Sequence, residues 1–427
     1  MGELKRLTNA VSRLENEALY VDLVTTSNIQ LRVGAMPDVS KVMSQLGVEA
    51  NCVVVADWEA SQAGDNHIGE EFVQWRAQVY GGPCKDYFGK RATLNVLYRN
   101  LDRTFSYFFD PKMTTIVRKR WLCKWVKRQP VEVIGKLGSL RIEFKKNNIL
   151  VFEGSRKIYD RREYRSPVEP GILVEQALAK VRRDGNNRDA LEVIVAGSGN
   201  GFFGTSASFI ARFGRRALWI DPCAQPAHSL ARIGVHWDDV TDLFISHNHE
   251  DHILGFSACL KRKMDRGERL RVITAKSIYE VLRKQYLPLF PEMDQCVEWM
   301  EVKPGKALDL DGMNIITRWN HHFLPYGTLG LKITAGGETW GLSGDTKFDH
   351  KINALLGREE LTESWFSDCK LIFHEVDFFN PGSVHTYWKE LERIRDSVKG
   401  EVFAYHTAAL ENPPIPIAQD AKTYRVA

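Results

Sequence analysis

The chain has 427 residues, of which 44% are hydrophobic and 26% are charged, and this suits a soluble globular protein of two or three domains. There is no apolar run of about 18 residues and no apolar segment near the first residue, so neither a membrane helix nor a secretory signal is expected. The seven cysteines are scattered without a C-x-x-C pair, which argues against a disulfide scaffold and predicts a reducing, cytoplasmic location.

The net charge of +4 is unevenly distributed. Residues 1–185 hold 30 Lys and Arg against 22 Asp and Glu, whereas residues 186–427 hold 28 against 32. A polar Gly/Asn stretch at 184–187 marks the change, so we expect a basic α+β domain over 1–185 and a second domain over 186–427. The basic domain would suit a phosphodiester or nucleic-acid substrate, although such an imbalance also serves solubility alone.

In the first part, the spacing of Leu4, Leu7, Val11 and Leu14 predicts a helix over residues 1–20. Short strands are expected at 19–24, 29–33 and 52–55, and a hairpin at 140–152. Residues 112–128 mix Lys and Arg with two tryptophans. They read as an amphipathic helix, with a phosphate-binding surface as the alternative. Residues 1–185 resemble no family, and no internal repeat is apparent in the chain.

The pattern changes from residue 190 onward. Strands are expected at 191–196, 208–213 and 217–221, with a Gly-rich turn between the first two. Another strand at 242–246 runs into an H-x-H-x-D-H motif that holds three imidazoles and two carboxylates, Ser246-His247-Asn248-His249-Glu250-Asp251-His252. Imidazole nitrogen and carboxylate oxygen are ligands of zinc and similar divalent ions, so the motif predicts a metal site at a sheet edge.

This order of elements, with the motif at 245–255, resembles the metallo-β-lactamase superfamily and within it the tRNase Z and phosphodiesterase branch. The resemblance covers about residues 190–410 and implies an α/β fold, an αββα sandwich. It also implies ligands that lie further along the chain. The chain supplies a histidine after a strand (His321 or His322, of which His322 suits the spacing better), a Gly-Asp-Thr with Asp345, and a last histidine, His406.

The resemblance implies two divalent ions, zinc or else manganese or iron, and no other cofactor. One ion would take three histidines, His247, His249 and His322. The other would take Asp251, His252 and His406, with Asp345 as the bridge between the two ions. Two such ions activate a water that lies between them, which Asp251 would help to orient. His385 would protonate the leaving group, with substrate binding or an ordinary surface position as the alternatives. His374 and Glu375 would support the site without touching the metal, or serve the structure alone.

With an Asp and not a Cys at the bridging position, the chain resembles the phosphodiesterase and glyoxalase II-like branches more than the zinc β-lactamases, which argues against antibiotic hydrolysis. We therefore expect a phosphodiesterase or nuclease that acts on nucleic acid or a nucleotide-derived phosphodiester. The alternatives are a hydrolase of a small ester, thioester or lactone, and a metal-binding module without activity. No membrane association is expected, and a homo-oligomer remains open.

Overall fold

The computed structural model divides the chain into two compact units, Met1–Ala177 and Leu178–Ala427. The boundary expected from the sequence, between residues 185 and 186, falls inside the second unit. The structure describes all residues except 1–2, 17–18, 35–38, 40–41, 44–45, 49, 51, 55–84, 93, 96–125, 132–133, 146–147, 165–175, 184–187, 201–204, 288–289, 323–326, 359–360 and 362.

The first unit contains two sheets. One has seven strands in chain order: β1 (Glu3–Arg6), β2 (Val11–Asn16), β3 (Leu19–Thr25), β4 (Gln30–Val33), β5 (Cys52–Val54), β6 (Lys85–Gly89) and β7 (Val126–Pro130). The other has four antiparallel strands: β8 (Ile134–Leu137), β9 (Leu140–Lys145), β10 (Asn148–Glu153) and β11 (Arg156–Asp160). Apolar side chains from both sheets, among them Leu31 and Ile142, form one buried core.

The helix expected over residues 1–20 is wrong. The segment forms the β1–β2 hairpin, in which Leu4 lies opposite Leu14. Val11 and Leu14 are buried, but Leu4 and Leu7 are each about 40% exposed. The four apolar residues therefore do not share one buried face, as a helix would have required. The hairpin expected at 140–152 is confirmed as β9 and β10. Most of the basic stretch at 112–128 lies outside the described residues, and its end belongs to strand β7.

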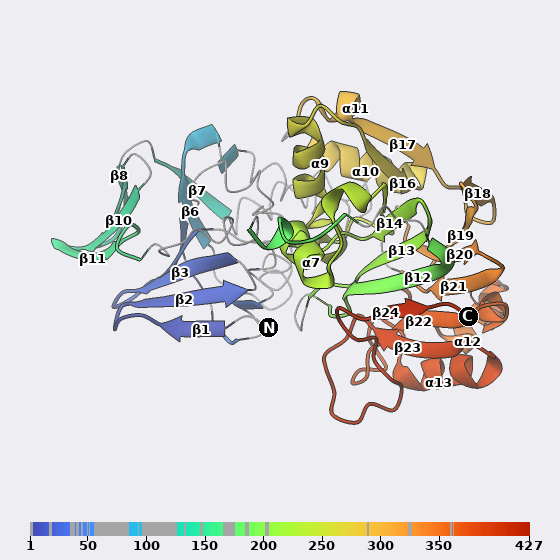
Figure 1. Cartoon of the computed structure of the whole chain (residues 1–427). Coiled ribbons are helices and arrows are strands. Elements are labelled where there is room, and N and C mark those ends of the chain that lie inside the picture. Colours follow the sequence, from blue (N-terminus) through green and yellow to red (C-terminus); the bar gives the residue numbers. More distant parts are fainter. Residues whose placement is uncertain are drawn as a thin grey trace. The chain divides into compact units, whose positions relative to one another are not determined.

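The second unit holds two packed sheets with helices on their outer faces (Figure 1). The seven-stranded sheet comprises β12 (Arg188–Gly197), β13 (Ser208–Gly214), β14 (Arg216–Ile220), β15 (Asp242–Phe244), β16 (Leu270–Thr274), β17 (Val297–Glu301) and β24 (Thr423–Arg425). The six-stranded sheet comprises β18 (Ala307–Leu310), β19 (Met313–Trp319), β20 (Leu329–Ala335), β21 (Glu338–Leu342), β22 (Leu371–Glu375) and β23 (Glu401–Tyr405).

Helices cover the outside of each sheet of this unit. Between strands of the first sheet lie α7 (Pro226–Ile233), the 3-10 turn η2 (Trp237–Asp239), α8 (Glu250–Ile253), α9 (Phe256–Asp265), α10 (Lys276–Tyr286) and α11 (Met293–Cys296). Beside the second lie α12 (His350–Leu356), η4 (Glu363–Phe366) and α13 (Trp388–Ser397), drawn in red tones in Figure 1. The expected αββα sandwich is confirmed.

Aromatic side chains join the two sheets of the second unit. The ring of Phe209 on β13 lies 5.1 Å from that of Tyr405 on β23 and 5.4 Å from that of Phe373 on β22, measured between centroids. Strand β22 is buried along its whole length, because a central strand here faces the partner sheet on one side and helices on the other. These contacts fix the ends of β13, β22 and β23 with respect to one another.

The first unit repeats the strand arrangement of the second. In both seven-stranded sheets, three antiparallel pairings are followed by three parallel ones, and only the edge strand differs, being β1 in one and β24 in the other. Likewise, the four antiparallel strands β8 to β11 of the first unit match the four antiparallel strands β18 to β21 in the six-stranded sheet of the second unit. The chain thus contains a repeat of topology that its sequence does not reveal.

Candidate metal centre

The H-x-H-x-D-H motif begins three residues after the end of β15, at the edge where the parallel strands finish. Asp221, directly after neighbouring β14, holds its start: the carboxylate accepts hydrogen bonds from the backbone N–H of Ser246 at 2.8 Å and from its hydroxyl at 2.5 Å. The same carboxylate lies 2.9 Å from Nδ1 of His252. Asp221 has a left-handed backbone, with φ of 49°, which only a well-supported residue tolerates. Asp221 therefore holds Ser246 and His252 of the motif in position.

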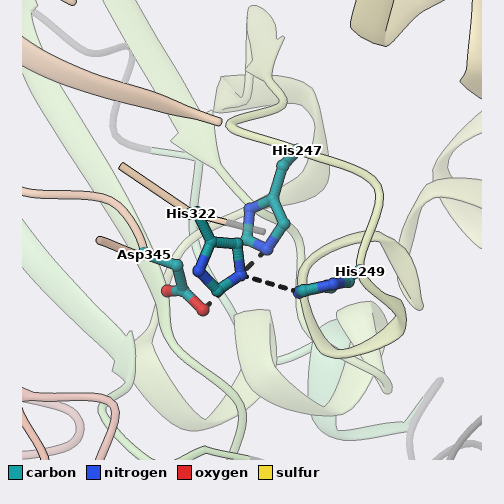
Figure 2. Close-up of side chains that lie close together, drawn as sticks. All are labelled: His247, His249, His322 and Asp345. Atoms are coloured by element: carbon teal, nitrogen blue, oxygen red, sulfur yellow. Dashed lines mark hydrogen bonds and ion pairs between the residues drawn. The ribbon is translucent and has the colours of Figure 1, made fainter. Parts of the chain in front are cut away.

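Four predicted ligands converge in one group, His247, His249, His322 and Asp345, whose ligand atoms all lie within 4.8 Å of one another (Figure 2). Nε2 of His322 is 3.4 Å from Nδ1 of His249, and Nε2 of His247 is 3.9 Å from Oδ2 of Asp345. Ligands about 2.0–2.1 Å from a tetrahedral ion stand roughly 3.3 Å apart, so these separations suit one metal ion.

A second group adjoins the first and contains Asp251, His252 and His406. Nε2 of His406 lies 3.2 Å from Oδ2 of Asp251, and Nε2 of His252 lies 3.8 Å from the same oxygen. Asp345 reaches this group too, because its Oδ2 is 3.5 Å from His406 and its Oδ1 is 3.5 Å from His252. One carboxylate therefore faces both groups, as the predicted bridge requires.

The hydrogen bonds around the ligands fit a metal. The hydroxyl of Ser246 donates to Asp221, so Nδ1 of His247, 2.9 Å away, must donate to that hydroxyl and Nε2 is left with its lone pair. Within the described chain, the buried Nε2 atoms of His247 and His252 and Oδ1 of Asp345 make no hydrogen bond. Buried polar atoms are normally satisfied, and a cation would satisfy all three.

The charge states of three histidines agree with that fit, whereas His252 differs: burial lowers its pKa, but Asp345 and Asp251 outweigh burial and raise it well above the usual value. Burial, and then the neighbouring imidazoles, lower the pKa of His247 and His249 well below the usual value, and burial lowers that of His322 to about 3. These three side chains are therefore neutral, as metal ligands must be. Burial works against the charge of Asp345, but His406 and His252 outweigh it and hold its pKa well below normal.

One backbone turn and one hydrogen bond from the side chain of Asn320 bring the distant ligands to the motif. Gly344 precedes Asp345 with φ of +61°, and a Cβ there would meet the carbonyl oxygen of Leu329 at 2.1 Å, so this position requires glycine. The Asn320 amide, directly before the two adjacent histidines, donates to the carbonyl of Ser343 at 2.8 Å. Together these contacts fix the segment after β19 against the segment after β21.

His385 lies beside the two groups of predicted ligands and forms a further group of potential ligand atoms with Asp345 and His406. Its ring is 4.9 Å from that of His406, and its Nδ1 is 3.0 Å from Oε2 of the fully buried Glu375. Burial alone would lower the pKa of His385, but the Glu375 carboxylate outweighs burial and raises it to about 9. The imidazole is therefore protonated at neutral pH and is placed to donate a proton.

The two remaining histidines of the prediction lie apart from the ligands. His321 joins no group of potential ligands in the described chain, whereas the adjacent His322 does. His374 is fully buried among Phe348 and Phe366, and its Nδ1 donates to the carbonyl of Glu375 at 2.8 Å. Glu375 acts on His385 and not on a ligand, while the supporting carboxylate behind the ligands is Asp221. A strand ending in a carboxylate was the only sequence signal for that role.

Residues 191–421, more than half of the chain, match the family described as anti-Pycsar protein Apyc1. The chain belongs to this Apyc1 family. The matched range spans all seven predicted ligands and His385, and leaves the first unit outside. With this membership and the grouped ligands, the protein is a metal-dependent hydrolase of the phosphodiesterase-like kind. No curated protein matches the sequence.

Solved structures resemble the Apyc1-family chain only distantly. A metallo-β-lactamase fold protein, YhfI from Bacillus subtilis, is 17% identical, with a TM-score of 0.46 over 56% of this chain and 100% of that one. A diphosphatase of the PhnP family is 15% identical, with a TM-score of 0.44 over 55% and 97%. A long-form RNase Z from yeast is 11% identical, with a TM-score of 0.41 over 96% and 69%. No substrate is inferred from likenesses of this degree.

When bound, divalent metal would supply Lewis-acid chemistry: it would polarise a phosphoryl oxygen and lower the pKa of a nucleophilic water. The side chains of the chain supply the rest. Asp251 offers a carboxylate oxygen next to both His252 and His406, where it would hold metal and help to orient a nucleophilic water. His385, held by Glu375, can protonate a leaving oxygen.

No helix in the part of the chain described is long and apolar enough to cross a membrane.

Proposed function

We propose that the protein is a binuclear metal-dependent phosphodiesterase that hydrolyses a nucleotide-derived phosphodiester. The observation that carries this proposal is the position of Asp345, whose carboxylate faces the histidine group on one side and the group of Asp251, His252 and His406 on the other. A shared carboxylate offsets the repulsion between two cations, and two cations clamp the attacking and leaving oxygens of a phosphoryl group.

Family membership supports a small substrate. The Apyc1 family is one of cyclic-nucleotide phosphodiesterases, which favours a cyclic mononucleotide over nucleic acid for this chain. His385 supports the same direction, because the sugar alkoxide that leaves from a nucleotide is a poor leaving group that needs a proton. The donor set of imidazoles and carboxylates favours zinc over magnesium or calcium, which prefer oxygen ligands alone.

The test joins metal analysis to a panel of substrates: cyclic nucleotides, a linear dinucleotide, bis-p-nitrophenyl phosphate and a lactone. We expect two divalent ions per chain and hydrolysis of the phosphodiesters. Asp345→Asn should lose at least one ion and lower kcat by more than about 100-fold, since even residues that merely support metal ligands are worth 10–100-fold.

Asp396→Asn is the matched control for that variant. Asp396 is 71% exposed on α13 and contacts only its neighbour Arg395 among the described partners, so metal content and kcat should stay at the wild-type level. Hydrolysis of the lactone without any of the phosphodiesters, or full activity in Asp345→Asn, would overturn the proposal.

A further inference from the structure

A cleft of about 470 Å³ opens on the same sheet edge as the ligand motif. Lys276 at the start of α10, Glu301 at the end of β17, Lys303 and the indole of Trp319 are among the side chains that line it. Its volume lies in the range of small-molecule sites, about 300–1,000 Å³. Neither the metal ligands nor His385 line it, so the chemistry described above leaves it unexplained.

The cleft is joined to the ligands by short connections. Trp319 ends β19 and precedes His322 by three residues. Asn248, which stands between the ligands His247 and His249, donates its amide to the carbonyl of Ile278 in α10 at 2.8 Å. Because neighbouring strands lie about 4.8 Å apart, the end of β17 is roughly 10 Å from the end of β15. A group joined to a phosphate at the ligands can therefore reach the cleft.

The lining favours a neutral aromatic group over an anion or an acyl chain. The ionisable side chains of the cleft are two lysines and two glutamates, so their formal charges cancel, and Lys303 is 3.8 Å from Glu301. Exposed ammonium and carboxylate groups offer donors and acceptors to the edge of a planar heterocycle, but they suit a hydrocarbon poorly. Trp319 offers the face on which such a heterocycle stacks.

Gly327 keeps the Trp319 ring in its place. A Cβ at Gly327 would lie 2.5 Å from Cζ3 and 2.7 Å from Cε3 of that indole, so the glycine backbone packs directly on the ring. The carbonyl of Trp319 also accepts a hydrogen bond from Arg358 at 3.1 Å. The aromatic surface is therefore held rigidly beside the cleft, which lowers the entropic cost of stacking a ligand on it.

We propose that this cleft is the nucleobase subsite of the enzyme and that Trp319 stacks on the base while the phosphate lies at the metal ligands. The proposal rests on the phosphodiesterase function given above and names the part of the substrate that the protein recognises. The lysines and glutamates around Trp319 would read the edge of the base.

The experiment compares phosphodiesters that carry a base with one that does not. Cyclic AMP and cyclic UMP are the nucleotides, and methyl p-nitrophenyl phosphate is the substrate without a base. Base–aromatic stacking predicts that Trp319→Ala raises KM for the cyclic nucleotides by about tenfold or more, with a much smaller effect on kcat. The rise in KM for the methyl ester should be several-fold smaller. Trp319→Phe, which keeps an aromatic face, should restore most of the nucleotide KM.

Two controls separate this role from a structural one. Metal content of each variant shows whether the nearby ligands are intact. Trp237→Ala removes a half-buried tryptophan from η2, which precedes β15 and so lies at the opposite sheet edge, and it should leave both KM values unchanged.

The outcomes distinguish this proposal from the function on which it rests. If the wild-type protein hydrolyses both kinds of substrate but Trp319→Ala raises the two KM values equally, the subsite is wrong and the phosphodiesterase stands. The subsite is also wrong if only the methyl ester is hydrolysed. If neither is hydrolysed by the metal-loaded protein, the phosphodiesterase function itself fails.

Discussion

His385, like His252 with Asp221, has a buried carboxylate as its hydrogen-bond partner. Glu375 also accepts hydrogen bonds from the backbone N–H groups of Thr346 and Thr386, so its position does not depend on His385. If His385 is a general acid, its importance should follow how badly the leaving group needs a proton. That dependence separates proton donation from mere support of the metal ligands.

We therefore expect His385→Ala to lower kcat for a cyclic nucleotide by about 100-fold or more, the usual worth of a general acid. Its effect on bis-p-nitrophenyl phosphate should be at least tenfold smaller, because p-nitrophenolate leaves without protonation. Steady-state kinetics on both substrates measure this. Equal losses on the two substrates would assign His385 to the support of the metal site instead. His350→Ala, a half-buried histidine paired with Glu390 on α13, is the control.

Asp221 acts on two segments of the motif at once, so its removal should loosen the metal without removing a ligand. Asp221→Asn keeps the size of the side chain but replaces one of the two oxygens that accept hydrogen bonds from Ser246 and His252 with an amide NH2. Metal affinity or activity should fall by about 10–100-fold, as for other residues that orient ligands. Titration with a competing chelator measures the affinity. An unchanged metal affinity would show that the segment from Ser246 to His252 keeps its position without the Asp221 carboxylate.

At the scale of elements, the sequence was most informative where apolar strands are buried on both sides. The strands β15, β19, β21 and β23 each lead into a polar segment, and this change of character led to the seven predicted ligands, which the structure brings together in two adjacent groups. It could not separate His321 from His322, because that choice depends on the path of the chain after Trp319. The helix expected over 1–20 failed for another reason. The edge strand β1 is exposed along its whole length, so no alternation of buried and exposed residues distinguished it from a helix.

The turn between β21 and Asp345 offers a test of how tightly the ligand-bearing elements are held. Gly344 and Gly357 both have φ of +61°, but a Cβ at Gly357 meets nothing within 4 Å, whereas at Gly344 it meets a backbone oxygen at 2.1 Å. Gly357→Ala should cost about 1–2 kcal/mol of unfolding free energy from the left-handed backbone alone. Gly344→Ala should cost about 1–3 kcal/mol more, because the two strands must separate.

Urea denaturation of both variants measures that difference. Gly344→Ala should also lose metal, since the carboxylate of Asp345 moves with the turn, while Gly357→Ala should keep it. Equal unfolding free energies for the two variants would mean that the β20 and β21 ends are loosely packed. In that case the position of Asp345 would be set by the metal and not by the fold.

At the scale of the whole chain, the first unit shares the strand order of the second but not its chemistry. Of the 12 histidines, only His67 lies before residue 178. The connection between β9 and β10 spans two residues, where the matching connection between β19 and β20 spans nine and carries His322. The segment that follows β5 begins Val55-Ala56-Asp57-Trp58-Glu59 and has no H-x-H-x-D-H motif. The repeated topology was invisible to sequence reading because strand order leaves no residue pattern.

The repeat makes metal stoichiometry a decisive measurement on the intact chain. Two equivalent sites would bind four divalent ions, but the lack of histidines in the first unit predicts two per chain, all held by the second unit. Elemental analysis of the purified, zinc-loaded protein counts them. His67→Ala should leave the count at two, whereas His249→Ala should reduce it. Removal of the ions with a chelator should lower Tm, because metal binds only the folded state, and zinc should restore it. Four ions, or a count that falls in His67→Ala, would give the first unit a metal site of its own.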